Sequence, residues 1–339
     1  MNHVDVLIVR TSHWAGDPRL KRHLDYLAAA GRVGTMVTFA GESRLVAWWK
    51  SLKEIATTGA SHVLVPDPDL FFLGSLVARV TGKRPVIDIH EDYGKAAMAR
   101  EWVPDWARFL VRVLADLAVA TGRLAAWRVL VAAPELAREG DHVALNIPDP
   151  AQLEPTPHDG SKRIVYVGDV TRARGAIAMV EMLSSLDEAF HLVLVGRVSE
   201  ETFDEIHEIA SQRGVENRIE LTGQLDHGQA WSRARGSLAG LNLLTDVPAY
   251  RQAVATKLWE YMSIGLPPVV SDLPGQRRLL TQVDSGLVAS TPGEAAQILE
   301  DLDGDPDRRS SLASACRRLS EAAWEQNRPD VVVQRVFDP

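Results

Sequence analysis

The sequence predicts an α/β protein made of two doubly wound domains, each with a parallel sheet. Short apolar runs recur along all 339 residues, and most are followed by a segment with helical periodicity. These runs are apolar throughout rather than alternating, which indicates strands buried on both faces under helices. Because strand and helix alternate repeatedly, we expect parallel strands joined by right-handed crossovers.

The expected strands fall into two sets of six, with helices between them. The strands are expected at 4–10, 33–40, 62–67, 85–90, 128–133 and 142–147, then at 163–169, 191–197, 217–223, 238–244, 267–272 and 285–290. The clearest helical segments are 18–30, 103–126, 174–186, 199–213 and 256–264. Between the sets lies a polar stretch rich in Pro, typical of an interdomain linker.

These patterns predict domain boundaries and the place of a site. We expect a first domain at 1–147, a linker at 148–162 and a second domain at 163–321. The sequence leaves open whether the segment 322–339 packs back onto the first domain or stays on the second. In open α/β sheets ligands bind at the carboxyl ends of the strands, so we expect a central cleft between the domains to hold the ligand.

Composition excludes several classes of protein. The chain is 46% hydrophobic and 24% charged, as expected of a folded protein with a large core, and its net charge of −8 gives no support for a nucleic-acid binder. Its one cysteine, Cys316, excludes an intrachain disulfide and a cysteine-based zinc cluster. The start lacks the features of a signal peptide, and no apolar run reaches the roughly 18 residues of a membrane span. We therefore expect a cytoplasmic protein.

The segment 255–272 has the pattern of a loop, a short helix, a Gly stop and a buried strand. The amino end of a helix suits a phosphate group, and Lys257 adds a positive charge there. Glu260, one turn on, could accept hydrogen bonds from two sugar hydroxyls. The alternative is an ordinary amphipathic helix on which both side chains are solvated.

Two further loops follow expected strands of the second domain. Gly168 to Gly175 contains Arg172 and Arg174, and Arg197 follows the next strand directly. Glycines allow a ligand to approach the backbone, and two arginines can clamp a diphosphate. The alternative is a solvated loop with exposed arginines.

In the first domain, His90, Glu91 and Asp92 form a dense ionisable cluster at a strand end. Such a cluster could contact a sugar or an acceptor. The alternative is a helix start, at which the two acids favour the helix dipole.

Taken together, these motifs resemble the donor half of the family-four GT-B retaining glycosyltransferases. The resemblance rests on the loop that ends at Arg174-Gly175, on Leu194-Val195-Gly196, and on the run from Thr256 to Asp272 that contains TKLWEYM. Gly16-Asp17-Pro18-Arg19 and the HEDY run at 90–93 are similar to the acceptor domain of one bacterial subgroup. The resemblance implies two Rossmann-like domains facing a cleft that binds a nucleotide sugar.

The resemblance also implies roles for individual residues. Arg174 matches a diphosphate-binding Lys, Lys257 and the backbone of 256–258 would hold the phosphates, Glu260 would hold the ribose, and His90 would contact the transferred sugar. The predicted catalytic residues are His90, Arg174 and Lys257; the donor-binding residues are Gly168, Arg172, Arg197, Thr256, Leu258 and Glu260; the acceptor-side residues are Gly16, Asp17, Arg19, Glu91 and Asp92.

Three positions depart from the family pattern. Gln252 stands where the first Glu of the E-x7-E pattern is expected, and Trp14-Ala15-Gly16 replaces a Gly-Gly loop. Asp169 stands where the family often has Arg. Because a carboxylate repels a diphosphate, we expect Asp169 to face away, or Arg172 to supply the cation instead.

The implied activity is a retaining transfer of a hexose-type sugar to a small-molecule (natural-product) or glycan acceptor, without a metal or a cofactor. The leaving diphosphate can deprotonate the acceptor while protein cations stabilise it. Two other hypotheses stay open: another GT-B enzyme, such as a nucleotide-sugar epimerase or a pseudo-glycosyltransferase coupling enzyme, and a catalytically degenerate partner protein. The base, the sugar, the acceptor and the oligomeric state stay open too.

Three other patterns are interpreted as structural. Asp67-Pro68-Asp69 resembles a metal-binding Asp-x-Asp motif, but we expect a loop and a helix start. The acidic stretch 301–307 fails the calcium-loop pattern and predicts a turn between helices. The stretch 102–130 is apolar nearly all around, which favours helices buried in a core over a membrane-surface helix.

Overall fold

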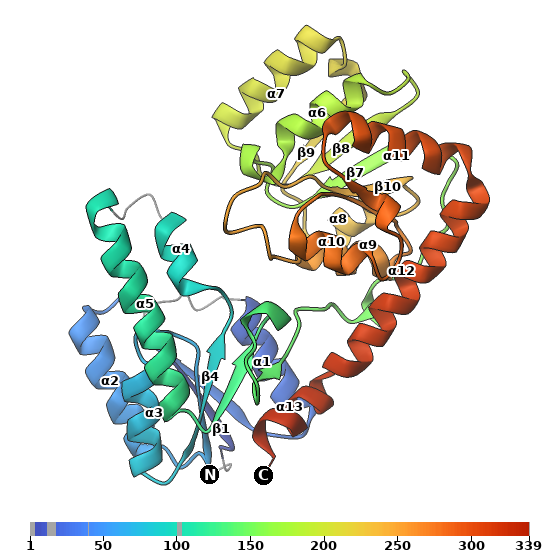
Figure 1. The fold of residues 1–339 in the computed structure, drawn as a ribbon. Coiled ribbons are helices and arrows are strands. Elements are labelled where there is room, and N and C mark those ends of the chain that lie inside the picture. Colours follow the sequence, from blue (N-terminus) through green and yellow to red (C-terminus); the bar gives the residue numbers. More distant parts are fainter. Residues whose placement is uncertain (1–3, 12–17, 40, 100–103, 339) are drawn as a thin grey trace. The chain divides into compact units, whose positions relative to one another are not determined.

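Figure 1 shows the computed structural model, which describes residues 4–11, 18–39, 41–99 and 104–338. The chain divides into unit 1, Met1–Asn146 with Gln326–Pro339, and unit 2, Ile147–Glu325. Each unit holds a sheet of six parallel strands covered by helices. No helix of the described ranges combines the length and the apolar character needed to cross a bilayer.

Unit 1 has the strand order β2-β1-β3-β4-β5-β6. Its strands are β1 (Val6–Arg10), β2 (Gly34–Thr38), β3 (His62–Val65), β4 (Arg84–Ile89), β5 (Arg128–Val131) and β6 (His142–Val143). Its helices are α1 (Pro18–Ala29), α2 (Arg44–Thr57), α3 (Phe71–Val80), α4 (Tyr93–Ala99), α5 (Asp105–Ala125) and α13 (Pro329–Phe337), with a 3-10 turn at Pro134–Leu136.

Both faces of the unit 1 sheet are covered, and β1 shows how. Its side chains alternate, so that Leu7 and Val9 enter the core beneath α2, α3 and α5, while Val6 and Ile8 enter the core beneath α1 and α13. Figure 1 shows α2, α3 and α5 together on one side of this sheet. The continuous apolar runs of the sequence therefore correspond to strands buried on both faces.

The C-terminal segment packs on unit 1. The helix α12 (Pro306–Asn327) begins in unit 2, and Pro329 starts α13 after the break at Arg328. Val332, Val333, Val336 and Phe337 of α13 are buried in the core that contains Val6. Of the two places that the sequence left open for this segment, the structure shows the first domain.

Unit 2 has the strand order β12-β11-β10-β7-β8-β9. Its strands are β7 (Arg163–Val167), β8 (His191–Val195), β9 (Ile219–Gly223), β10 (Ala239–Asn242), β11 (Pro268–Ser271) and β12 (Val288–Ala289). Its helices are α6 (Ala176–Ser184), α7 (Glu200–Arg213), α8 (His227–Ala234), α9 (Thr256–Ser263), α10 (Pro274–Leu280) and α11 (Pro292–Gly304), in addition to α12, with 3-10 turns at Pro150–Gln152, Arg172–Arg174, Glu216–Arg218 and Ser285–Leu287.

Strand order reverses between β7 and β10 in unit 2. The chain runs outward through β8 and β9, then returns to the other side of β7 and continues through β11 and β12. A crevice at such a reversal, outside the carboxyl ends of the strands, is the usual ligand site of an open α/β sheet. The fold therefore places the site of unit 2 next to the ends of β7 and β10.

All twelve expected strands are confirmed within a few residues at their ends. One expectation is wrong. The helix expected within 102–130 is not buried all around: α5 packs one side against α3 and α4 and leaves large apolar side chains exposed on the other. Helical periodicity alone could not show this, because apolar residues occupy both arcs of the helix.

Candidate functional site

A cavity of about 630 Å³ lies at the reversal point of unit 2. It is bounded by the loops after β7, β8 and β10 and by the first turn of α9. Six of the eight donor-side residues predicted in unit 2 line it: Gly168, Arg174, Arg197, Thr256, Lys257 and Glu260. We refer to this cavity as the β7–α9 pocket.

The ammonium group of Lys257 is buried in this pocket and has no hydrogen-bond partner. Its Nζ lies 3.6 Å from the ring centroid of Tyr166, and a Cβ built on Gly168 would lie 2.7 Å from it. Gly168 also has φ of +136°, so only glycine suits this position. Burial, and then the charge of Arg174, lower the pKa of Lys257 to about 7, although Glu260 and Asp169 partly oppose the shift.

Arg174 and Arg197 meet at Asp169. Arg174 Nη1 lies 3.5 Å from Asp169 Oδ2, and Arg197 Nε donates to Asp169 Oδ1 at 3.1 Å. Neither expectation for Asp169 is met, because its side chain lines the pocket and pairs with two cations. The carboxylate therefore holds two arginines at the pocket.

Arg172 and Leu258 do not take the predicted places. Arg172 pairs with Glu205 of α7 and does not line the pocket. Leu258 is fully buried, and its backbone N–H donates to Ala255 O at 3.0 Å. In this structure Arg172 thus contacts α7, and the amide of Leu258 has a partner at the start of α9; their roles in donor binding stay predictions.

The amino end of α9 carries no side-chain cap, because its N-cap residue is Ala255. The neighbouring helices α7 and α8 are capped by Ser199 and Asp226. Tyr261 anchors α9 to the sheet by accepting a hydrogen bond from Val167 N at 2.8 Å. The fold thus holds an uncapped helix end, with its partial positive charge, beside the end of β7.

Glu260 is paired with a residue that sequence reasoning missed. Glu260 Oε1 lies 2.9 Å from His227 Nε2, and this contact raises the pKa of His227. His227 begins α8, just after β9, so its place beyond a strand end was the available signal. Gln252 lies outside the pocket lining and accepts from Arg278 at 3.3 Å.

In unit 1, the predicted cluster lies at the end of β4. A ring nitrogen of His90 lies 3.2 Å from the Tyr93 hydroxyl, and the two rings meet edge to face. Asp92 accepts from Lys95 N at 3.0 Å and pairs with Lys95 Nζ at 2.8 Å. Asp92 therefore acts at the start of α4, which fits the alternative interpretation for this residue.

Other predicted positions of unit 1 are only partly described. Gly16, Asp17 and the side chain of Arg19 lie outside the described residues. Asp67 is fully buried and accepts from Thr11 N at 2.6 Å, while Asp69 accepts from the Thr11 hydroxyl at 2.9 Å. The Asp67-Pro68-Asp69 motif therefore holds the chain after β1 in place.

Across the described part of the chain, no group of three or more His, Cys, Asp or Glu residues is placed to hold a metal ion. A smaller cavity of about 390 Å³ lies at the opposite, amino end of the unit 2 strands, between the linker and α12. The β7–α9 pocket is the better candidate, because it combines the strand carboxyl ends, an uncapped helix end and an unpartnered ammonium group.

Comparison with known proteins gives matches of three kinds. The family profile of glycosyl transferases group 1 matches residues 150–319. D-inositol 3-phosphate glycosyltransferase of Xylanimonas cellulosilytica is 25% identical over 173 residues, which cover 49% of this chain and 40% of that protein. Glycosyltransferase 1 domain-containing protein 1 of Xenopus tropicalis is 22% identical over 175 residues, which cover 48% of this chain and 47% of that protein. The matched part thus spans less than half of each curated relative.

Solved structures share the fold over nearly the whole chain. HepE of Anabaena in complex with UDP has a TM-score of 0.74 at 15% identity and covers 98% of this chain and 97% of its own. A glycosyltransferase of Rickettsia africae has a TM-score of 0.72 at 13% identity, with both chains fully covered. At such low identity, these scores show a common fold.

Proposed function

The chain belongs to the family of glycosyl transferases group 1 and has the GT-B fold, and we propose that it transfers a sugar from a nucleotide diphosphate. One observation carries the proposal. Lys257 presents a buried ammonium group without a hydrogen-bond partner to a pocket that also contains Arg174 and Arg197. A buried charge is costly unless it is paired, so this pocket suits a dianionic diphosphate.

The proposed donor is a hexose-type nucleotide sugar bound in the β7–α9 pocket. Its diphosphate would contact Lys257, Arg174 and the uncapped end of α9. Glu260 would hold the ribose, in exchange for its contact with His227. HepE has been solved with UDP-glucose, which makes UDP-glucose the first donor to test.

The proposed reaction is metal-independent and retains the configuration of the sugar. Negative charge develops on the diphosphate as the bond to the sugar breaks, and the cations of the pocket stabilise it. The leaving phosphate oxygen takes the proton of the acceptor hydroxyl on the same face. We propose His90 for contact with the transferred sugar, and Glu91 and Asp92 for the acceptor side, where the acceptor is a small molecule or a glycan.

A thermal-shift panel with UDP, GDP, ADP and dTDP tests the donor site. Binding to the folded state raises the melting temperature by mass action, so we expect one nucleotide to stabilise the protein clearly more than the others. Absence of a shift with every nucleotide would contradict donor binding. It would favour the degenerate partner protein.

Product analysis tests the reaction class, and Asp169 and Gln252 justify including the epimerase alternative. A transferase yields an α-linked product from an α-linked donor only when an acceptor is present, and EDTA leaves its rate unchanged. Conversion of the donor sugar without an acceptor would instead identify an epimerase. Loss of activity in EDTA would contradict the metal-independent mechanism.

A further inference from the structure

Unit 1 carries a concentrated apolar surface that its own fold does not cover. Among the described residues, 16 large hydrophobic side chains are exposed, and 14 of them lie on α2, α3 and α5. They include Trp49 of α2, Phe72 and Leu76 of α3, and Trp106, Phe109 and Leu117 of α5. We call the exposed apolar residues of these three helices the outer apolar face. Such a concentration on one side of one unit indicates an interaction surface.

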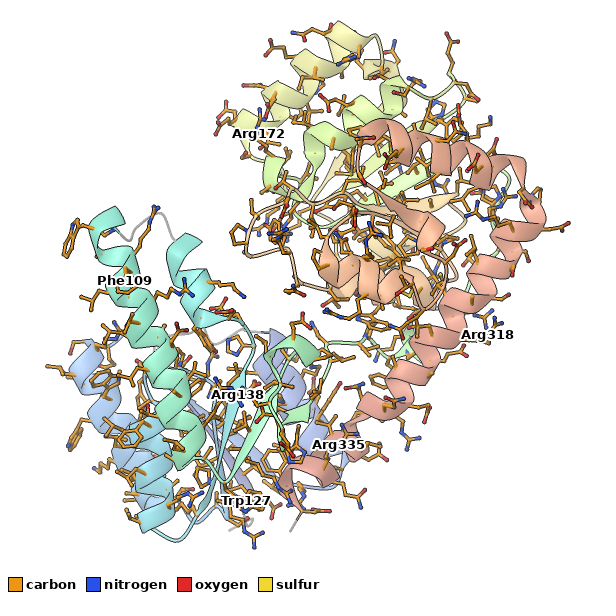
Figure 2. All side chains as sticks on the ribbon, viewed as in Figure 1. Phe109, Trp127, Arg138, Arg172, Arg318 and Arg335 are labelled. Carbon is orange, nitrogen blue, oxygen red and sulfur yellow. The ribbon has the colours of Figure 1, made fainter. Side chains whose placement is uncertain are left out.

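The helix α5 shows that the exposure is not a by-product of core packing. Ala115 and Val119 of α5 pack against the core of unit 1. On the other arc, Trp106, Leu110 and Leu117 recur at helical spacing along one stripe, and Trp106 is 83% exposed. Figure 2 shows Phe109 on this helix, where it is 73% exposed. The helix therefore has two apolar arcs, and only one of them has a partner within unit 1.

The same helices carry positive charge in an otherwise acidic chain. They contain seven Lys or Arg and three Asp or Glu, whereas the whole chain has a net charge of −8. Lys53 and Arg112 are exposed; Lys53 Nζ lies 5.4 Å from the centroid of the Trp49 ring, and Arg112 Nε lies 3.7 Å from the exposed Asp116. Exposed Trp, Phe and Leu bordered by Lys and Arg are the pattern of helices that lie in the interface of an anionic membrane.

We propose that the outer apolar face binds the surface of an anionic lipid bilayer. The apolar side chains would enter the boundary between headgroups and acyl chains, and the lysines and arginines would contact lipid phosphates. A second copy of the chain fits less well, because symmetric contact would bring two positively charged faces together. The proposal rests on this face alone and does not depend on the proposed transferase activity.

Flotation of the full chain with vesicles tests the proposal. One set contains phosphatidylcholine alone, and in the other phosphatidylglycerol replaces part of it. We expect binding to the anionic vesicles, weakened by salt, and at least about a tenfold loss in the double variant Phe109→Ser, Leu110→Ser. The double variant Lys53→Gln, Arg112→Gln should lose about fivefold for each cation removed.

Matched controls come from unit 2. Phe203 and Arg213 of α7 are exposed outside the face, so Phe203→Ser and Arg213→Gln should float like the unchanged protein. Circular dichroism and the melting temperature report whether each variant is folded.

Failure of the folded protein to bind anionic vesicles would overturn the proposal. So would equal binding to both vesicle types, or binding that survives both double variants. A dimer that Phe109→Ser, Leu110→Ser converts to a monomer, without vesicle binding, would assign the face to a second copy instead.

Discussion

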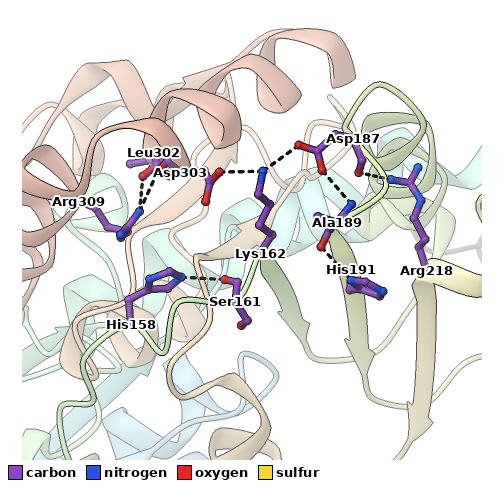
Figure 3. A network of polar contacts seen from close by, with 10 residues as sticks. All are labelled: His158, Ser161, Lys162, Asp187, Ala189, His191, Arg218, Leu302, Asp303 and Arg309. Atoms are coloured by element: carbon purple, nitrogen blue, oxygen red, sulfur yellow. Dashed lines mark hydrogen bonds and ion pairs between the residues drawn. The ribbon is translucent and has the colours of Figure 1, made fainter.

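A lysine lies at each end of β7, and the two lysines have opposite electrostatic surroundings. Lys162, just before the strand, lies 2.8 Å from Asp187 and 2.9 Å from Asp303, in the network drawn in Figure 3. Those contacts raise its pKa, whereas burial and Arg174 lower the pKa of Lys257 to about 7 at the other end. The lysine at the amino end of the strand is thus paired with two carboxylates, and the lysine at the carboxyl end is buried without a hydrogen-bond partner.

The comparison distinguishes a lysine whose charge the protein balances from a lysine whose charge we expect a ligand to balance. Lys162 joins the start of β7 to α11 through Asp303, and solvent can reach all three side chains, so its pairs contribute little to stability. Lys257 forms no such ion pair: its ammonium group lies over the Tyr166 ring and is buried without a hydrogen bond. Such a group is retained where a ligand completes it, which is the central claim of the proposed function.

The largest expected effect comes from Lys257→Met. Loss of a charge-assisted hydrogen bond to the diphosphate should weaken UDP-glucose binding about 10- to 100-fold in calorimetry. The melting temperature of the free protein should rise, because a buried unpaired charge is removed.

Lys162→Met is the matched control at the other end of the strand. It should leave UDP-glucose affinity unchanged and lower the melting temperature slightly, because both its carboxylate contacts lie near solvent. Equal losses of UDP-glucose affinity in Lys257→Met and Lys162→Met would contradict a specific role of Lys257 in donor binding.

The pH dependence of binding is the next largest effect. In the free protein the pKa of Lys257 is about 7, and a bound diphosphate raises that pKa. At a pH between the pKa of the free protein and that of the complex, binding is therefore accompanied by uptake of a proton. Affinity should be highest below pH 7 and fall by up to about tenfold for each pH unit above it. Calorimetric titrations of UDP-glucose across this range check the slope, and a flat profile would contradict the assignment.

The smallest expected effect is that of Asp169→Asn. The change frees Arg174 and Arg197 from a competing carboxylate and removes its repulsion of the diphosphate, so UDP-glucose affinity should rise about threefold. Asp187→Asn, at the amino end of β7, should leave the affinity unchanged. A fall in affinity for Asp169→Asn would show instead that Asp169 orients the arginines for binding.

The strands were well predicted from the sequence because strand formation here follows from a local run of apolar residues. In the expected run 163–169, Ile164, Val165 and Tyr166 are consecutive and all buried, so both faces of β7 are covered. The place of Lys257 was also predictable, since a helix start after a strand end follows from the chain pattern. His227 was missed because its partner, Glu260, is 33 residues away, and only the folded sheet brings them together.

The places of Arg172 and of the apolar arcs of α5 depend on contacts that sequence patterns do not contain. Arg172 and Arg174 are the same residue type, two positions apart. One turn of 3-10 helix nevertheless directs Arg172 to Glu205 and leaves Arg174 in the pocket. The apolar character of α5 predicted burial, yet α3 and α4 cover only one of its arcs. Which side of a helix finds a partner depends on tertiary packing.

Proton uptake on donor binding tests the central claim most directly. UDP-glucose, whose diphosphate is already fully ionised, is titrated at pH 8 in two buffers that differ in ionisation enthalpy. The account predicts uptake of about one proton per molecule bound, because Lys257 is then mostly neutral in the free protein, and no uptake in Lys257→Met. Tight binding without proton uptake in the unchanged protein, or the same uptake in Lys257→Met, would contradict it.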